Sequence, residues 1–148
     1  MLWHYTTHVR AGRILECGEL RPRVAAYSLP GEPPLLWFSA RQDYEPTALK
    51  IFEQGNQRGC MTFSEQLARF GLARFGIPDD YPDLMRWKEA CQYSGIGRDE
   101  RRQMELYGRK LGADRANWFA IARPVTTVDT RFSLYLDHCW VNYTLTAL

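Results

Sequence analysis

The sequence has few residues that suit metal binding or disulfide formation. Its 148 residues include three histidines and four cysteines, which are Cys17, Cys60, Cys91 and Cys139. No two cysteines form a C-x-x-C pair, and no histidine stands at a zinc-finger spacing from them, so we expect no metal site. We expect free, mostly buried thiols, as in a reduced cytoplasmic compartment.

Long apolar runs and strong catalytic motifs are also missing. No apolar run approaches the length of about 20 residues that spans a membrane, and the first residues lack the basic and apolar segments of a secretory signal. The sequence has no G-x-S-x-G, P-loop, H-E-x-x-H or G-x-G-x-x-G motif. Enzyme classes that depend on these motifs are therefore not expected, and neither is membrane insertion.

Lysine is scarce, whereas arginine is abundant. The chain has three Lys against sixteen Arg, and its formal net charge is only +2. Arginine binds phosphate and carboxylate through two parallel hydrogen bonds, although a GC-rich coding sequence produces the same bias. The net charge does not favour a nucleic-acid-binding protein, and we treat the basic run between Arg98 and Lys110 as a solvated helix face.

The residues that are present predict a single domain over 1–148 with an α+β fold. Hydrophobic residues make up 45% of the chain and aromatic residues 14%, enough for one core. Residues 2–6 alternate as a strand, with Trp3 and Tyr5 on one side. Thr6 or Thr7 caps a helix that ends near Cys17, before Gly18. Residues 19–34 contain five prolines or glycines after Leu20 and are expected to form a long loop, of a kind that is often functional.

The rest of the chain gives further element signals. A second strand is expected over 35–39, and Thr62 with Glu65 fits a capping box. A strand over 72–77 would bury Ala73 while Arg74 faces outward. Helices are expected from Pro82 and over 98–111, the latter with an apolar stripe of Met104, Tyr107 and Leu111, and strands over 118–125 and 134–143. This order predicts a small mixed sheet with helices clustered in the second half of the chain.

Three short motifs resemble those of a known family. The opening Leu2-Trp3-His4-Tyr5-Thr6-Thr7, followed by Ile14-Leu15-Glu16-Cys17-Gly18-Glu19-Leu20 and then by Trp37-Phe38-Ser39, resembles ADP-ribosyltransferase-like proteins. The segment Glu45-Pro46-Thr47-Ala48-Leu49-Lys50 is similar to one in a group of small bacterial and phage proteins. The resemblance covers about the first quarter of the chain. It implies an ADP-ribosyltransferase-like architecture with NAD as substrate.

The resemblance also implies residue roles. His4 would bond a ribose hydroxyl, with Thr6 beside it, and Trp37 or Phe38 would pack on the nicotinamide ring. Cleavage of the nicotinamide–ribose bond passes through an oxocarbenium-like cation, so an acid must lie near it. No Glu follows Glu105, and Asp137, expected within the last strand, is the acid of choice. The complete set of expected NAD contacts is His4, Tyr5, Thr6, Trp37, Phe38, Ser39 and Arg74.

Each of these residues also has a purely structural interpretation. His4 can be a hydrogen-bonded strand histidine, Trp37 and Phe38 can be core residues, and Asp137 can pair with an arginine. The leading hypothesis is a cytoplasmic NAD-binding protein that modifies a macromolecular acceptor or cleaves NAD. The alternative is a non-catalytic phage- or plasmid-borne protein that inhibits a host complex. RNA binding through the arginine-bearing helices is a third, less favoured hypothesis.

Overall fold

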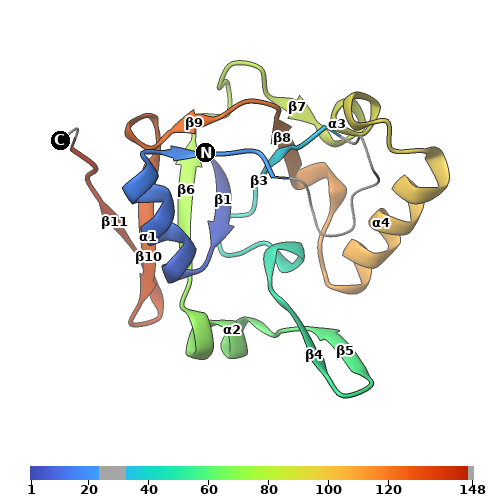
Figure 1. Cartoon of the computed structure of the whole chain (residues 1–148), viewed down its shortest axis with the longest axis horizontal. Coiled ribbons are helices and arrows are strands. Elements are labelled where there is room, and N and C mark those ends of the chain that lie inside the picture. Colours follow the sequence, from blue (N-terminus) through green and yellow to red (C-terminus); the bar gives the residue numbers. More distant parts are fainter. Residues whose placement is uncertain (24–32, 147–148) are drawn as a thin grey trace.

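The computed structural model describes residues 1–23 and 33–146 of the chain. Within these residues it has four α-helices and three short 3-10 helices (Figure 1). The α-helices are α1 (His8–Cys17), α2 (Phe63–Phe70), α3 (Trp87–Ser94) and α4 (Arg98–Lys110). The 3-10 helices are η1 (Pro46–Ala48), η2 (Arg115–Asn117) and η3 (Thr127–Asp129).

A seven-stranded sheet forms the centre of the fold. Its order is β11-β10-β6-β1-β3-β8-β7, and every neighbouring pair is antiparallel. The fold is therefore α+β, as predicted, but the sheet is larger than expected and not mixed. Its strands are β1 (Leu2–Thr6), β3 (Leu36–Ser39), β6 (Ala73–Ile77), β7 (Met85–Arg86), β8 (Trp118–Ile121), β10 (Arg131–Leu136) and β11 (Cys139–Tyr143).

Two small ribbons complete the strands. β2 (Glu19–Leu20) pairs with β9 (Val125–Thr126), and β4 (Ile51–Gln54) pairs with β5 (Gln57–Cys60). The β4–β5 hairpin projects from the body of the molecule in Figure 1. The sequence of this hairpin gives little strand signal, and no strand was expected there, because only Ile51 and Phe52 in it carry large apolar side chains.

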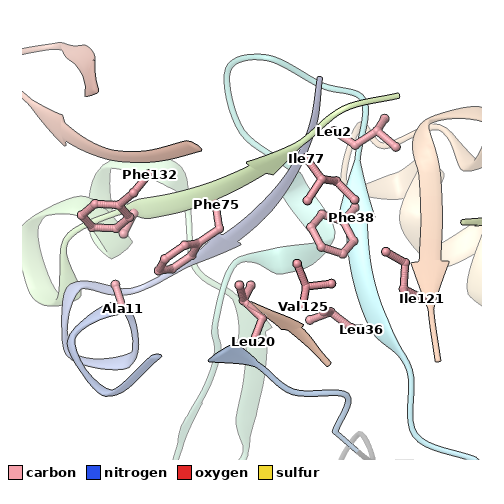
Figure 2. Close-up of a cluster of buried hydrophobic side chains, with 11 residues drawn as sticks. Leu2, Ala11, Leu20, Leu36, Phe38, Phe75, Ile77, Ile121, Val125 and Phe132 are labelled. Carbon is pink, nitrogen blue, oxygen red and sulfur yellow. The ribbon is translucent and has the colours of Figure 1, made fainter. Parts of the chain in front are cut away.

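The main apolar core lies on one face of the sheet. Figure 2 shows Phe75 and Phe132 meeting Ala11 of α1, while Leu20 of β2 and Val125 of β9 lie beneath β3. Capping residues set where helix α1 begins and ends. The Thr7 hydroxyl accepts a hydrogen bond from the amide of Arg10, and Gly18 adopts a left-handed conformation. The predicted strand, cap and stop of this region are thus confirmed.

The opposite face of the sheet carries the tryptophans. Trp3, Trp37 and Trp118 share this face because cross-strand partners point to the same side, and Trp140 joins them through its pairing with Tyr135. Trp87 of α3 packs on them, with its ring centre 5.6 Å from that of Trp37. All five tryptophans of the chain therefore lie on one side of the sheet.

Several predicted boundaries are wrong. The helix expected from Pro82 begins at Trp87, after the short edge strand β7. The expected last strand is two strands, joined by a turn at Asp137 and His138. Both turn residues have positive φ, at 46° and 64°, and such values suit a two-residue hairpin connection. The capping box of Thr62 and Glu65 is confirmed.

The loop expected over 19–34 contains β2 at its start and an isolated bridge between Arg23 and Leu35. Its residues 24–32 lie outside the described part of the chain. The four cysteines, all among the described residues, form no disulfide, but they are not mostly buried, since Cys17 and Cys139 are exposed, Cys60 is half-buried and Cys91 is buried. Among residues 1–23 and 33–146, no helix is long and apolar enough to cross a membrane, and no cluster of His, Cys, Asp or Glu suits a metal ion.

Candidate functional site

The sheet separates the predicted NAD contacts into two groups. His4, Thr6 and Phe38 lie on the core face, where α1 packs. The other contacts lie on the tryptophan face, because strand residues alternate in direction; they are Tyr5, Trp37, Ser39 and Arg74. One ligand cannot contact both groups from one side of the sheet.

His4 is the best-defined polar group on the core face. Its Nδ1 lies 2.9 Å from the carbonyl oxygen of Trp37, and the edge of its ring meets Phe38 at 5.9 Å between ring centres. A carbonyl oxygen only accepts, so Nδ1 carries the hydrogen and donates it. The Nε2 atom of neutral His4 is then an acceptor, and it has no hydrogen-bond partner within residues 1–23 and 33–146.

The surroundings of His4 favour its neutral form. Burial lowers the pKa of His4, the bond to Trp37 opposes that effect, and the charges of Arg10 and Arg23 lower the pKa further. His4 is thus uncharged at neutral pH, with two guanidinium groups near it. Arg10 and Arg23 are not among the site residues expected from the sequence. The position of Arg10 on the helix directly after the His4 strand could have indicated that its charge would act on His4.

On the tryptophan face, Arg74 points away from the core face, as predicted, but it is enclosed rather than solvated. It is only 7% exposed, and its guanidinium carbon lies 3.7 Å from the ring centre of Trp3 and 4.2 Å from that of Trp140. Burial lowers the pKa of Arg74, and Tyr5 partly opposes this. No carboxylate within the described residues forms an ion pair with Arg74, whose Nε has no hydrogen-bond partner.

Arg74 acts with two aromatic side chains to hold the segment after β3. The hydroxyl of Tyr5, the guanidinium of Arg74 and the Nε1 of Trp140 donate to three consecutive carbonyl oxygens, those of Arg41, Gln42 and Asp43. The donors come from β1, β6 and β11. Backbone carbonyls inside the protein need such donors, so the arrangement explains Arg74 and Tyr5 without a ligand.

Ser39 belongs to a second buried network, centred on Glu45. Ser39 donates to Glu45 at 2.7 Å, the Thr47 hydroxyl does so at 2.7 Å, and Trp118 Nε1 lies 3.3 Å from the same carboxylate. Glu45 is only 5% exposed. The segment Glu45–Lys50, noted in the sequence for its resemblance, therefore contains a structural carboxylate that the predicted site did not include.

Asp137 does not lie within a strand, contrary to the prediction. It is exposed in the turn between β10 and β11, and β6 separates β10 from the His4 strand. Two strand spacings amount to about 10 Å, and the turn extends beyond the end of β1. The fold thus does not bring Asp137 to His4.

Comparison with known proteins supplies no relative. No protein-family model, curated protein or solved structure matches this chain. The class defined by the fold is an α+β protein with a large antiparallel sheet and four α-helices in the described residues.

Proposed function

We propose that this protein has an ADP-ribosyltransferase-like architecture and binds NAD or a related nucleotide at the site around His4. The observation that supports it is a neutral histidine whose Nε2 has no hydrogen-bond partner among the described residues, and whose pKa is lowered by the charges of Arg10 and Arg23. A ribose hydroxyl would donate to this Nε2, and the two guanidinium groups suit a pyrophosphate. Thr6 and Phe38 share this face of the sheet and would line the same site.

The proposed ligand contacts differ from the set expected from the sequence. Tyr5, Trp37, Ser39 and Arg74 lie across the sheet, and Tyr5, Ser39 and Arg74 have structural hydrogen-bond partners there. We retain His4, Thr6 and Phe38 and add Arg10 and Arg23. Modification of a macromolecular acceptor, or NAD cleavage, needs a carboxylate near the reacting ribose. We do not propose Asp137 for that role.

A non-catalytic interaction protein that inhibits a host complex is the second candidate. Helix α4 favours it, because Met104, Leu106 and Tyr107 are each more than 40% exposed. A protein partner would cover apolar surface of this kind. This candidate predicts a complex whose stability falls when Met104 and Tyr107 are replaced by Ser, with no dependence on His4.

The test of nucleotide binding is a thermal-shift and calorimetric titration with NAD, ADP-ribose and nicotinamide. A ligand that binds only the folded state adds about 2.7 kcal/mol of stability at a hundredfold excess over Kd. The critical variant is His4→Asn, whose amide can still donate to the Trp37 carbonyl but lacks an acceptor at the Nε2 position. The matched control is His138→Asn. His138 is exposed in a turn and has positive φ, which asparagine tolerates.

We expect NAD and ADP-ribose to stabilise the wild-type protein and the His138→Asn control, but not His4→Asn. Arg10→Gln should weaken ADP-ribose binding more than nicotinamide binding, because only ADP-ribose carries a pyrophosphate. The proposal is overturned if none of the three ligands binds, or if folded His4→Asn binds them with unchanged affinity.

A further inference from the structure

Helix α4 packs against the rest of the protein through one narrow face. Among the residues from Arg98 to Lys110, Gly108 is buried, Arg101 and Glu105 are half-buried, and the rest are exposed. At Gly108, an added Cβ would lie 2.6 Å from the Trp118 ring, so the backbone of α4 rests directly on that side chain. Glu105 holds the same face of α4 in place, because its carboxylate accepts hydrogen bonds from Trp87 Nε1 and from Arg115, each at 2.7 Å.

The solvent side of this attachment holds two cavities that share walls. Their volumes are about 420 and 410 Å³, and both are lined by Arg101, Glu105 and Arg115. The first extends along α4 and the second extends toward α3 and η2, so the two cavities lie next to each other. Among the described residues, their remaining charged lining is basic and comprises Arg98, Arg102, Arg109, Arg86 and Lys88. We call these residues, with Arg101 and Arg115, the α4 basic surface.

Charge on the α4 basic surface is far from balanced. Among the residues that the structure describes, Glu105 is the one acid that lines the two cavities, and it is already engaged by Arg115 and Arg101. Burial opposes the charge on Glu105, but the hydrogen bonds from Arg115 and Trp87 outweigh it and keep its pKa below the ordinary range. Glu105 is therefore ionised at neutral pH and compensates one of seven positive charges.

The arginines of α4 are spaced so that they share one side of the helix. Arg98, Arg102 and Arg109 follow each other at intervals of four and seven residues, which places them on the same face. None of the three forms an ion pair within the described residues. At 1.5 Å per residue they extend over about 16 Å of the helix. An extended ligand with regularly repeated negative charges matches this row better than a single small anion.

From this geometry we infer that the α4 basic surface binds the phosphate backbone of a nucleic acid. Guanidinium groups match phosphate oxygens in pairs, and the two neighbouring cavities would receive phosphates of one strand. The surface does not involve His4. Figure 1 shows α3 and α4 at the end of the sheet formed by β7 and β8, opposite the β10–β11 hairpin. Binding at the α4 basic surface therefore does not depend on the proposed nucleotide site at His4.

The test uses the full chain and fluorescein-labelled 12-mers of mixed sequence, as single-stranded RNA, single-stranded DNA and duplex DNA. The critical variant replaces Arg98, Arg102 and Arg109 by Gln. The matched control replaces Arg13, Arg69 and Arg131 by Gln, since these three are exposed elsewhere and the change in net charge is identical. Binding is followed by fluorescence anisotropy between 50 and 200 mM salt.

We expect at least one oligonucleotide to bind with a Kd at or below about 100 μM, as in sequence-independent recognition. The critical variant should weaken binding at least tenfold and reduce the slope of log K against log salt by about 2, since about 0.7 to 0.9 counterions are released per phosphate contact. The control variant and His4→Asn should bind as the wild type does. The comparison among the three oligonucleotides identifies the preferred strand type.

The inference is overturned if no oligonucleotide binds at 50 mM salt, or if both triple variants lose affinity equally, because the effect then follows net charge alone. Polyglutamate of matched charge is the competitor. Displacement of the oligonucleotide by polyglutamate at equal concentration would assign the surface to an acidic protein instead.

Discussion

The guanidinium carbon of Arg74 lies 4.2 Å from the ring centre of Trp140, so a buried cation is held against an aromatic face on the last strand of the sheet. The same guanidinium carbon lies 3.7 Å from the ring centre of Trp3. Arg74 also donates to the Gln42 carbonyl and so links β1, β6 and β11 to the segment that follows β3.

Arg74 and Trp140 should be coupled energetically. Cation–π contacts contribute about 0.5–1 kcal/mol at exposed sites and about 2 kcal/mol when desolvated, so a double-mutant cycle with Arg74→Gln and Trp140→Leu should give a coupling of about 1–2 kcal/mol. Urea unfolding of the four proteins measures it. Effects that simply add would show that the two side chains stabilise the fold independently.

Replacing Glu45 should destabilise the protein to a degree that depends on the substitution. Glu45→Ala removes the acceptor of Ser39, Thr47 and Trp118, and we expect a loss of about 2–4 kcal/mol for the unsatisfied donors. Glu45→Gln should cost about 1 kcal/mol, because the Ser39 hydroxyl can turn and accept from the amide. Denaturant midpoints at constant m-value give the loss of stability of each variant. Equal losses for Glu45→Ala and Glu45→Gln would contradict the hydrogen-bond network described for Glu45.

The stability of the protein should depend on pH through His4. Its pKa is lowered in the folded state relative to 6.5, so the unfolded chain binds a proton before the folded chain does. The free energy of unfolding must therefore decrease as pH falls below about 6.5, by at most about 1.4 kcal/mol per pH unit.

This pH effect is checked by urea unfolding at several pH values between 7.5 and 5.5. His4→Asn should lack this component, while His138→Asn should retain it. An NMR titration of the His4 ring carbons gives the folded-state pKa directly, and a midpoint at or above 6.5 would contradict the assigned environment.

Two glycine substitutions in helices should have opposite effects. Gly108→Ala forces a Cβ to within 2.6 Å of the Trp118 ring and should destabilise the protein by about 1–3 kcal/mol. Gly12→Ala in α1 meets no atom within 4 Å and should stabilise the protein by about 0.5–1 kcal/mol through helix propensity. Thermal unfolding of both variants is sufficient. Stabilisation by Gly108→Ala would show that α4 does not rest on Trp118.

Asp137 should be dispensable for ligand binding. Asp137→Asn keeps a residue that tolerates positive φ and removes the charge from the hairpin turn. We expect unchanged stability within about 0.5 kcal/mol and unchanged NAD affinity. A loss of NAD binding in this variant would restore the acid role that the sequence suggested.

Local features of this fold were predictable because their causes are local. The Thr7 cap, the Gly18 stop and the capping box of Thr62 and Glu65 depend on residues within one helical turn, and all are confirmed. The alternation of β1 also depends on neighbouring residues alone. It correctly separates Tyr5 from His4, and this separation already divided the expected NAD contacts between two faces.

The burial of Arg74 and the exposure of the α4 apolar stripe were not predicted, for a reason that lies outside their own segments. Strand alternation places Arg74 and Phe75 on opposite faces of the sheet, but a solvated arginine and a buried one give the same sequence pattern. The difference comes from Trp140 and the Gln42 carbonyl, which are far away in the chain. Similarly, the apolar stripe of Met104 and Tyr107 predicted a buried helix face, and both residues are exposed.

The sequence by itself determined the α+β class, most of the helix ends, and which residues of each strand share a face, since short-range hydrogen bonding and the two-residue period decide these. Only the tertiary structure decided which face each partner segment covers. It gathers the five tryptophans on one side, buries Arg74 and Glu45, and moves Asp137 to a hairpin turn. These outcomes follow from strand pairing between segments distant in the chain, and nothing within a segment specifies its distant neighbour.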